Sequence, residues 1–127
     1  TNLSEISIPD SVIKIDMFAF SGCTSLSKIS ISDSCTEIGT FAFYECTSLS
    51  EISIPDSVTE IGMSAFENCT SLRSVVIPES CIDVGAYVFK DCTNLEKVKI
   101  SDNFSQSEKE LIFEGTPWIE DIVYANQ

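Results

Sequence analysis

The sequence predicts an α/β solenoid, in which parallel strands line one side and short strands or helical turns form the other sides. The first observation behind this prediction is a fixed period, because a leucine recurs every 23 residues at Leu3, Leu26, Leu49, Leu72 and Leu95. The second is that each period holds the same short apolar segments and turn residues. One copy alone has too few apolar residues to form a core. We therefore expect the copies to stack and to cover one another.

The chain is expected to form one domain, because 127 residues suit a single continuous core. The predicted units are repeats at 3–25, 26–48, 49–71, 72–94 and 95–113, followed by a C-terminal capping segment at 114–127.

The first element of each repeat is a strand followed by a turn, which is clearest in the third copy. Ile52 and Ile54 flank Ser53 there. Branched apolar residues at a period of two predict a strand with one buried face. The Pro-Asp-Ser sequence at 55–57 then predicts a turn, because proline fixes a turn-compatible backbone angle and short polar side chains bond to nearby backbone.

The rest of the third copy predicts two further sides of the coil. Val58 and Ile61 form a second short apolar segment, which Gly62 ends. The spacing of the next apolar residues predicts one helical turn with an inward face; they are Ala65, Phe66 and Cys69.

The fifth copy departs from the pattern after its strand. Residues 95–103 keep the strand and turn, but the following residues lose the second apolar segment and the cysteine. Phe113 lies 24 residues after Phe89, one residue out of step. We expect the tail after the Gly-Thr-Pro break at 115–117 to cover the open end of the last repeat. Its apolar residues are Trp118, Ile119, Ile122 and Val123.

The first copy shows no such capping device. Thr1 and Asn2 match the last two positions of a repeat, which predicts a fragment of a longer array. An uncapped first repeat also predicts possible end-to-end self-association of the chain.

The repeat resembles the 23-residue unit of BspA-like leucine-rich repeat proteins. The shared pattern is Leu-x-x-Ile-x-Ile-Pro-x-Ser-Val-x-x-Ile-Gly-x-x-Ala-Phe-x-x-Cys, and it covers residues 1 to about 100. The resemblance implies a leucine-rich-repeat superhelix with the parallel sheet on its concave face. It also implies a cell-surface or secreted protein of bacteria or parasitic protists that adheres to host molecules or other cells. No catalytic residues are implied.

In the common leucine-rich repeat, an asparagine ladder ties neighbouring turns together. Here the corresponding position predicts a ladder of hydroxyl groups that bond to the backbone of the adjacent repeat. Its members are Ser11, Ser34, Ser57 and Ser80, with Asn103 in the last copy.

Composition excludes several classes of function. Acids outnumber bases 20 to 7, giving a net charge of −13 that repels nucleic acid and anionic membrane surfaces. No apolar run approaches the roughly 18 residues that a membrane span needs, so no membrane insertion is expected. The chain has no histidine, no glycine-rich phosphate loop and no inward pair of acids. We therefore expect no enzyme activity, no cofactor and no metal site.

The six cysteines are best explained as buried free thiols. Cys23, Cys46, Cys69 and Cys92 share one repeat position, and Cys35 and Cys81 replace valine at another. A disulfide or metal ladder is the alternative. Stacked identical positions rarely give the dihedral angle of a disulfide, and the chain has no Cys-x-x-Cys pair. Cysteine packs well as a small hydrophobic residue.

Two further columns have an ordinary and a functional interpretation. The turn acids predict solvated side chains, with a bound Ca²⁺ as the alternative; they are Asp10, Asp33, Asp56, Glu79 and Asp102. The residues at position 16 of each repeat predict packing over a corner, with an exposed docking strip as the alternative. They are Phe18, Phe41, Ser64 and Tyr87.

The outward strand positions form the candidate binding surface, because they vary between copies and four of the seven basic residues lie on or beside them. The predicted ligand-binding residues are Lys28, Glu51, Arg73, Ser74, Val76, Lys97 and Lys99. The predicted function is an extracellular module that binds a protein or glycan on another cell or in the matrix. The alternative is a structural spacer that holds neighbouring domains apart and has no ligand of its own.

Overall fold

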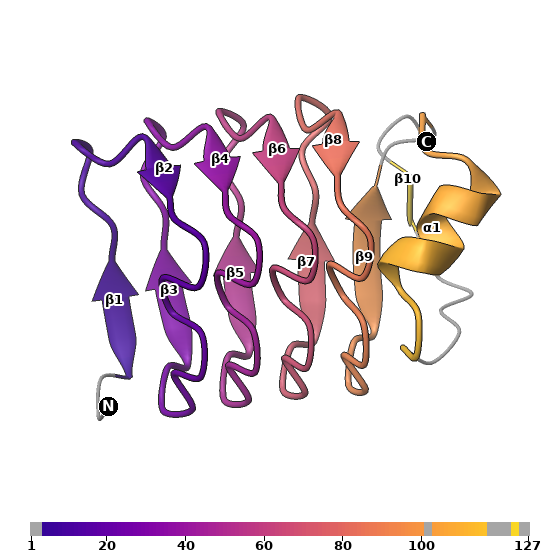
Figure 1. Ribbon diagram of the computed structural model, residues 1–127, viewed down its shortest axis with the longest axis horizontal. Coiled ribbons are helices and arrows are strands. Elements are labelled where there is room, and N and C mark those ends of the chain that lie inside the picture. Colours follow the sequence, from indigo (N-terminus) through magenta and orange to yellow (C-terminus); the bar gives the residue numbers. More distant parts are fainter. Residues whose placement is uncertain (1–3, 101–102, 117–122, 125–127) are drawn as a thin grey trace.

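The computed structural model describes residues 4–100, 103–116 and 123–124, and in this part of the chain the backbone coils into stacked turns. A large parallel sheet forms one side (Figure 1), with the strand order β1-β3-β5-β7-β9-β10. Its strands are β1 (Glu5–Ser7), β3 (Lys28–Ser30), β5 (Glu51–Ser53), β7 (Ser74–Val76), β9 (Lys97–Ile100) and β10 (Val123–Tyr124). The predicted solenoid with a parallel sheet is confirmed.

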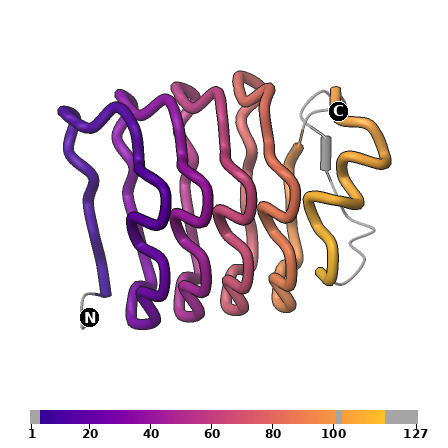
Figure 2. Tube along the Cα trace, in the orientation of Figure 1, coloured from indigo at the N-terminus to yellow at the C-terminus, as the bar shows by residue number. Residues whose placement is uncertain are grey.

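A small parallel sheet forms the second side of the coil. Its strands are β2 (Lys14–Ile15), β4 (Glu37–Ile38), β6 (Glu60–Ile61) and β8 (Asp83–Val84), in that order. Both sheets pair residues 23 apart, such as Ile6 with Ile29 and Ile38 with Ile61. The 23-residue period of the sequence therefore sets the register in which the strands pair. The Cα trace shows the turns lying side by side along the long axis (Figure 2).

The third side consists of tight turns, so the predicted helical turn at Ala65, Phe66 and Cys69 is wrong. In the third copy, Ala65 N–H donates to Gly62 C=O at 3.3 Å, and Cys69 N–H donates to Phe66 C=O at 3.3 Å. The third residue of each turn, Ser64 or Asn68, has a positive φ of 58° or 65°. This angle is typical of type II turns and is incompatible with a helix.

The turns of the third side are also bonded from one copy to the next. The Phe20 N–H donates to Ala42 C=O at 2.7 Å, and the Phe43 N–H donates to Ala65 C=O at 2.7 Å. The same bond recurs at Phe66. The coil is therefore held by backbone hydrogen bonds on all three sides, which satisfies polar groups that would otherwise be buried.

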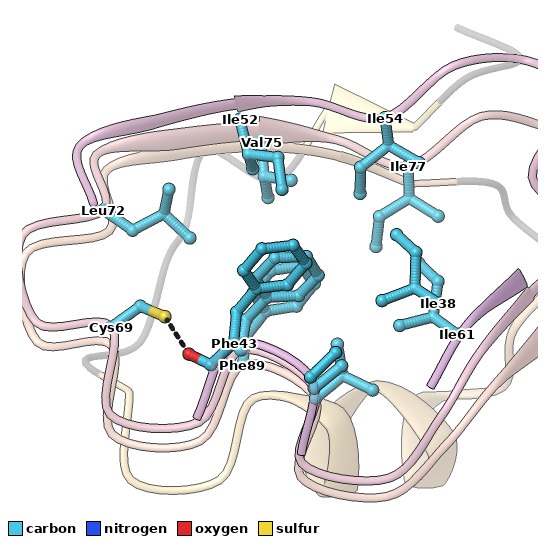
Figure 3. Close-up of a cluster of buried hydrophobic side chains, with 14 of the residues drawn as sticks. Ile38, Phe43, Ile52, Ile54, Ile61, Cys69, Leu72, Val75, Ile77 and Phe89 are labelled. Carbon is cyan, nitrogen blue, oxygen red and sulfur yellow. Dashed lines mark hydrogen bonds between the residues drawn. The ribbon is translucent and has the colours of Figure 1, made fainter. Parts of the chain in front are cut away.

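A column of phenylalanine rings fills the centre of the coil (Figure 3). The rings of Phe43 and Phe66 stack with centroids 5.1 Å apart, and those of Phe66 and Phe89 lie 5.4 Å apart. All three side chains are fully buried. Each copy thus covers the ring of its neighbour, as a repeat without its own closed core requires.

The interpretation of the cysteines as free packed thiols is confirmed. All six are free, and five are buried. The Cys69 thiol donates to Phe43 C=O of the preceding copy at 3.3 Å, the dashed line in Figure 3. Cys46 and Cys92 make the equivalent bonds to Phe20 and Phe66. Burial raises the pKa of the Cys46 and Cys92 thiols to about 12, and raises that of Cys69 well above its ordinary value.

The hydroxyl ladder is present in the third and fourth copies. The Ser57 hydroxyl donates to Cys35 C=O at 2.6 Å, and the Ser80 hydroxyl donates to Asp56 C=O at 2.6 Å. A second ladder runs along the threonines before the small sheet, where Thr59 donates to Thr36 C=O at 3.3 Å. Hydroxyl groups therefore bridge neighbouring copies as predicted.

Helix α1 (Gln106–Ile112) replaces the small sheet at the C-terminal end. Ser105 caps it, because its hydroxyl accepts from Glu108 N–H while the Glu108 carboxylate accepts from Ser105 N–H. The Phe113 ring then stacks on Phe89 with centroids 5.6 Å apart, so the aromatic column continues despite the one-residue slip. No described helix is long and apolar enough to span a membrane.

Part of the predicted capping segment can be placed. Val123 lies in β10, which pairs in parallel with β9 and extends the large sheet beyond the last full copy. Trp118, Ile119 and Ile122 lie outside the described residues, as do Leu3 and Asp102. Helix α1, which the sequence did not predict, also lies at this end of the stack (Figure 1).

Candidate binding surface

The outer face of the large sheet carries the predicted binding residues because side chains alternate along each strand. In β3 and β5 the middle isoleucine, Ile29 or Ile52, is buried and its two neighbours are exposed. Register then places the exposed residues of successive strands side by side, as with Lys28 and Glu51. We call this surface, defined by the outward residues of β1, β3, β5, β7 and β9, the large-sheet face.

A shallow hollow of about 220 Å³ lies on this face, over β3, β5 and the start of β7. Lys28 and Glu51 line it together with three serines, Ser30, Ser53 and Ser74. The serines are the reason for the hollow, because their small side chains leave the sheet backbone accessible between longer neighbours.

Four basic residues without a described ion-pair partner lie on or beside the same face. Of the seven basic residues, Lys14 pairs with Glu37 at 3.2 Å, Lys90 pairs with Glu114 at 3.6 Å, and Lys109 is buried. The other four have no ion-pair partner within the described part of the chain; they are Lys28, Arg73, Lys97 and Lys99. Within the described residues, the cations that lack an ion-pair partner thus lie on or beside one surface.

The predicted site residues divide into two neighbouring groups. Lys28, Glu51 and Ser74 line the hollow. The others are exposed on or next to β7 and β9, where Val76 is 54% exposed and is paired in register with Lys99. They are Arg73, Val76, Lys97 and Lys99. The predicted set omits Ser30 and Ser53, although their outward positions follow from the same alternation.

The residues at position 16 do not form a continuous strip. Phe18 is 53% exposed and stacks on the half-buried Phe41 with centroids 5.1 Å apart, but Ser64 is buried. Tyr87 is half-buried, and the Lys90 ammonium lies 4.9 Å from the centre of its ring. Packing over the corner explains these side chains, except for the exposed part of Phe18.

The turn acids are exposed at every described position, which fits solvated side chains; they are Asp10, Asp33, Asp56 and Glu79. Among the described residues there is no group of three or more His, Cys, Asp or Glu side chains arranged to hold a metal ion.

Comparison with known families and structures agrees with the repeat geometry. A family model described as "BspA type Leucine rich repeat region (6 copies)" matches residues 1–120. Comparison with curated proteins found no match.

Several solved bacterial proteins share the fold. A leucine-rich repeat protein from Bacteroides ovatus is 32% identical with a TM-score of 0.84, over 96% of this chain and 30% of that one. A leucine-rich cell surface protein from Faecalibacterium prausnitzii is 28% identical with a TM-score of 0.84, over 98% and 32%. The pneumococcal vaccine antigen PcpA is 26% identical with a TM-score of 0.77, over 81% and 25%. The chain therefore spans about a third of the length of the first two.

Proposed function

Because the chain belongs to the BspA-type leucine-rich repeat family, we propose that it is an extracellular binding module. In this proposal the large-sheet face contacts a protein or glycan on another cell or in the matrix. Leucine-rich repeat solenoids of this kind are typically not enzymes. The repeated inward positions and turns of this chain are accounted for by packing and by hydrogen bonds between copies.

The observation that carries the proposal is the difference between the two faces of the large sheet. The inward residues repeat as isoleucine or valine in every strand from β1 to β9. The outward residues change sign and size, as from Glu51 in β5 to Ser74 in β7 and Lys97 in β9. A side chain that packing does not dictate is available for recognition, and free cations collect on this face.

The proposed location is the cell surface or the extracellular medium. Two of the similar solved structures support it, since one is described as a cell surface protein and another as a vaccine antigen. Free buried thiols are compatible with this location, because burial keeps Cys46 and Cys92 protonated and out of contact with oxidants.

The test is binding of the labelled protein to mammalian epithelial cells and to their extracted matrix. Charge reversal at two sites of the face, Lys97→Glu with Lys99→Glu, should abolish most binding. A double variant with the same net charge, Lys14→Glu with Lys90→Glu, changes cations outside the large-sheet face and should retain it. Loss of binding in the second variant with retention in the first would show that another surface makes the contact.

A spacer is the second candidate, and the regularity of the stack favours it. Residues 26–94 form three successive copies without insertion, and the chain covers about a third of similar proteins. A spacer would bind neither cells nor matrix in the same assay. It would instead be needed only for the spacing of attached domains, which deletion of one 23-residue copy would shorten.

A further inference from the structure

We propose that the large-sheet face binds a carboxylated oligosaccharide of about three rings, with its acidic ring at the β7–β9 end and its neutral rings in the serine hollow. This inference rests on the proposed function and adds the chemical class of the ligand. It follows from three properties of the face: the absence of peptide-binding features, the polar hollow, and the position of the free cations.

The face lacks the features by which proteins usually anchor other proteins. Its outward strand residues include no aromatic side chain and one apolar residue, Val76. Protein hot spots are enriched in tryptophan and tyrosine seated in apolar pockets. An added peptide strand would need a free sheet edge, whereas the hollow lies over β3 and β5, which are bonded on both sides. A polar ligand suits this surface better.

The hollow presents groups that pair with sugar hydroxyls. Ser30, Ser53 and Ser74 both donate and accept hydrogen bonds, and the Glu51 carboxylate accepts them. Lys28 lines the hollow beside Glu51, its register neighbour on the adjacent strand, and donates hydrogen bonds there. Lys28 and Glu51 balance each other's charge, so the hollow favours neither sign, and the part of the ligand placed here is neutral and rich in hydroxyls. This argues against a densely sulfated chain.

The opposite end of the face suits an anionic group. Lys97 and Lys99 are exposed on the same side of β9, and Arg73 is exposed just before β7. Among the described residues, Glu96 is the one acid within three sequence positions of these cations, so three cations stand near one described acid. Three strand spacings separate β3 from β9, a distance of about 14 Å. An oligosaccharide of about three rings spans such a distance.

Two natural sources share this chemistry, a glycan that ends in sialic acid and a glycosaminoglycan that contains uronic acid. The experiment titrates the full chain with 3′-sialyllactose and, separately, with a hyaluronan hexasaccharide, and follows backbone amide shifts by NMR. We expect shifts to map to β3, β5, β7 and β9 with at least one of the two. Lactose, which lacks the carboxylate, should bind about tenfold more weakly. Equal affinity for lactose would overturn the role of the carboxylate.

Variants test the two halves of the site. Lys97→Gln with Lys99→Gln should weaken binding about tenfold, whereas Lys14→Gln with Lys90→Gln has the same net charge and should not. Ser53→Val fills the hollow with a residue that strands favour, and should also weaken binding. Equal loss in both lysine pairs would reduce the effect to overall charge and would overturn the proposal.

The result also separates this inference from the proposed function. If neither oligosaccharide binds but cell binding still requires Lys97 and Lys99, the ligand class is wrong and the face is right. Preferential binding of a poly-glutamate peptide over both oligosaccharides would likewise overturn the glycan. If cell binding is unchanged when both Lys97 and Lys99 are replaced, the large-sheet face is not the binding surface.

Discussion

In the interior copies, residues 26–94, the chain passes from the small sheet to the third side at a glycine, whereas at the C-terminal end helix α1 takes the place of that segment. Both arrangements supply the same contacts to the copy before. Leu111 C=O and Ile112 C=O accept from Tyr87 N–H and Phe89 N–H, as a further copy would. The stack therefore requires hydrogen-bond acceptors at fixed positions, and either a further copy or a helix can place them there.

Thr116 shows the same principle for the cysteine column. In the interior, a thiol donates to the buried phenylalanine carbonyl of the preceding copy, as Cys69 does to Phe43. At the C-terminal end the Thr116 hydroxyl donates to Phe89 C=O at 2.5 Å and accepts from Cys92 N–H at 3.1 Å. This position requires a hydrogen-bond donor to the phenylalanine carbonyl of the preceding copy, and either a thiol or a hydroxyl group can supply it.

The largest difference between the two regions should appear in the aromatic column. Phe66 is fully buried between two rings, and Phe66→Ala should lower the free energy of unfolding by about 3–5 kcal/mol. Phe113 is half-buried and has one ring neighbour, so Phe113→Ala should cost less, about 1–3 kcal/mol. Urea unfolding followed by circular dichroism measures both. Equal losses would mean that the C-terminal turn is as tightly packed as the interior.

The glycine junction should give the next largest effect. A Cβ at Gly62 would lie 2.6 Å from the Thr40 backbone nitrogen of the preceding copy. Gly62→Ala should therefore destabilise the protein by about 1–3 kcal/mol through forced separation of the copies. The first copy has Asp16 at this position, exposed to solvent. Asp16→Ala is the matched control and should change thermal unfolding little.

The interior thiols should make stability fall at high pH. Burial holds the Cys69 pKa well above its ordinary value of 9.0. The unfolded chain thus loses this proton near pH 9 while the folded chain keeps it, and the stabilisation present below pH 9 is lost as pH rises. The free energy of unfolding should fall between pH 9 and 10.5 in the wild type, and it should fall less steeply in Cys69→Ala. The difference between the two slopes should be about 1.4 kcal/mol per pH unit, the contribution of one thiol proton. Ile61→Val removes core volume without a titrating group and should keep the wild-type slope.

The smallest effect on stability is expected from removing the hydroxyl group of Thr116. Thr116→Val removes the donor to Phe89 C=O while keeping the shape, which should cost about 1–2 kcal/mol. Thr47→Val, at an exposed position, is the control. Hydrogen exchange should localise the change to α1 and the copy before it. A change spread evenly along the stack would contradict the view that each copy depends mainly on its neighbours.

End-to-end self-association through the first copy stays a prediction. Ile13, Met17 and Phe18 are 62%, 60% and 53% exposed there, which favours contact with another surface. Sedimentation velocity over a range of concentrations measures it, and Phe18→Ser should weaken any association seen.

Much of the fold could be predicted because the period determines the strand register. Ile52 and Ile54 point to one face by simple alternation, and 23-residue pairing follows from the spacing of equivalent residues. The third side could not be predicted in detail. Ala65, Phe66 and Cys69 fit one helical turn as well as two successive tight turns, and the positive φ angles fall on Ser64 and Asn68 instead of glycine. No local signal separates these possibilities.

The candidate site was predicted in outline and missed in detail. Alternation placed Lys28, Glu51 and Ser74 outward, but a hollow depends on the short side chains between them, Ser30 and Ser53. Thr116 was not predicted as the counterpart of the cysteines, because it lies 24 residues after Cys92 and a strict 23-residue period does not align it with them. Helix α1 follows a recognisable capping box, Ser105 with Glu108, which could have revealed it.

The direction of the hydrogen bonds between copies has a mechanical consequence. Strands β1 and β10 lie at opposite ends of the long axis, and the backbone bonds that join the copies run along that axis (Figure 1). Tension between the two ends would load one junction in series with the next and open them one at a time. Each released copy of 23 residues adds about 80 Å of extended chain. A chain pulled from its two ends would therefore lengthen in steps before it unfolds completely.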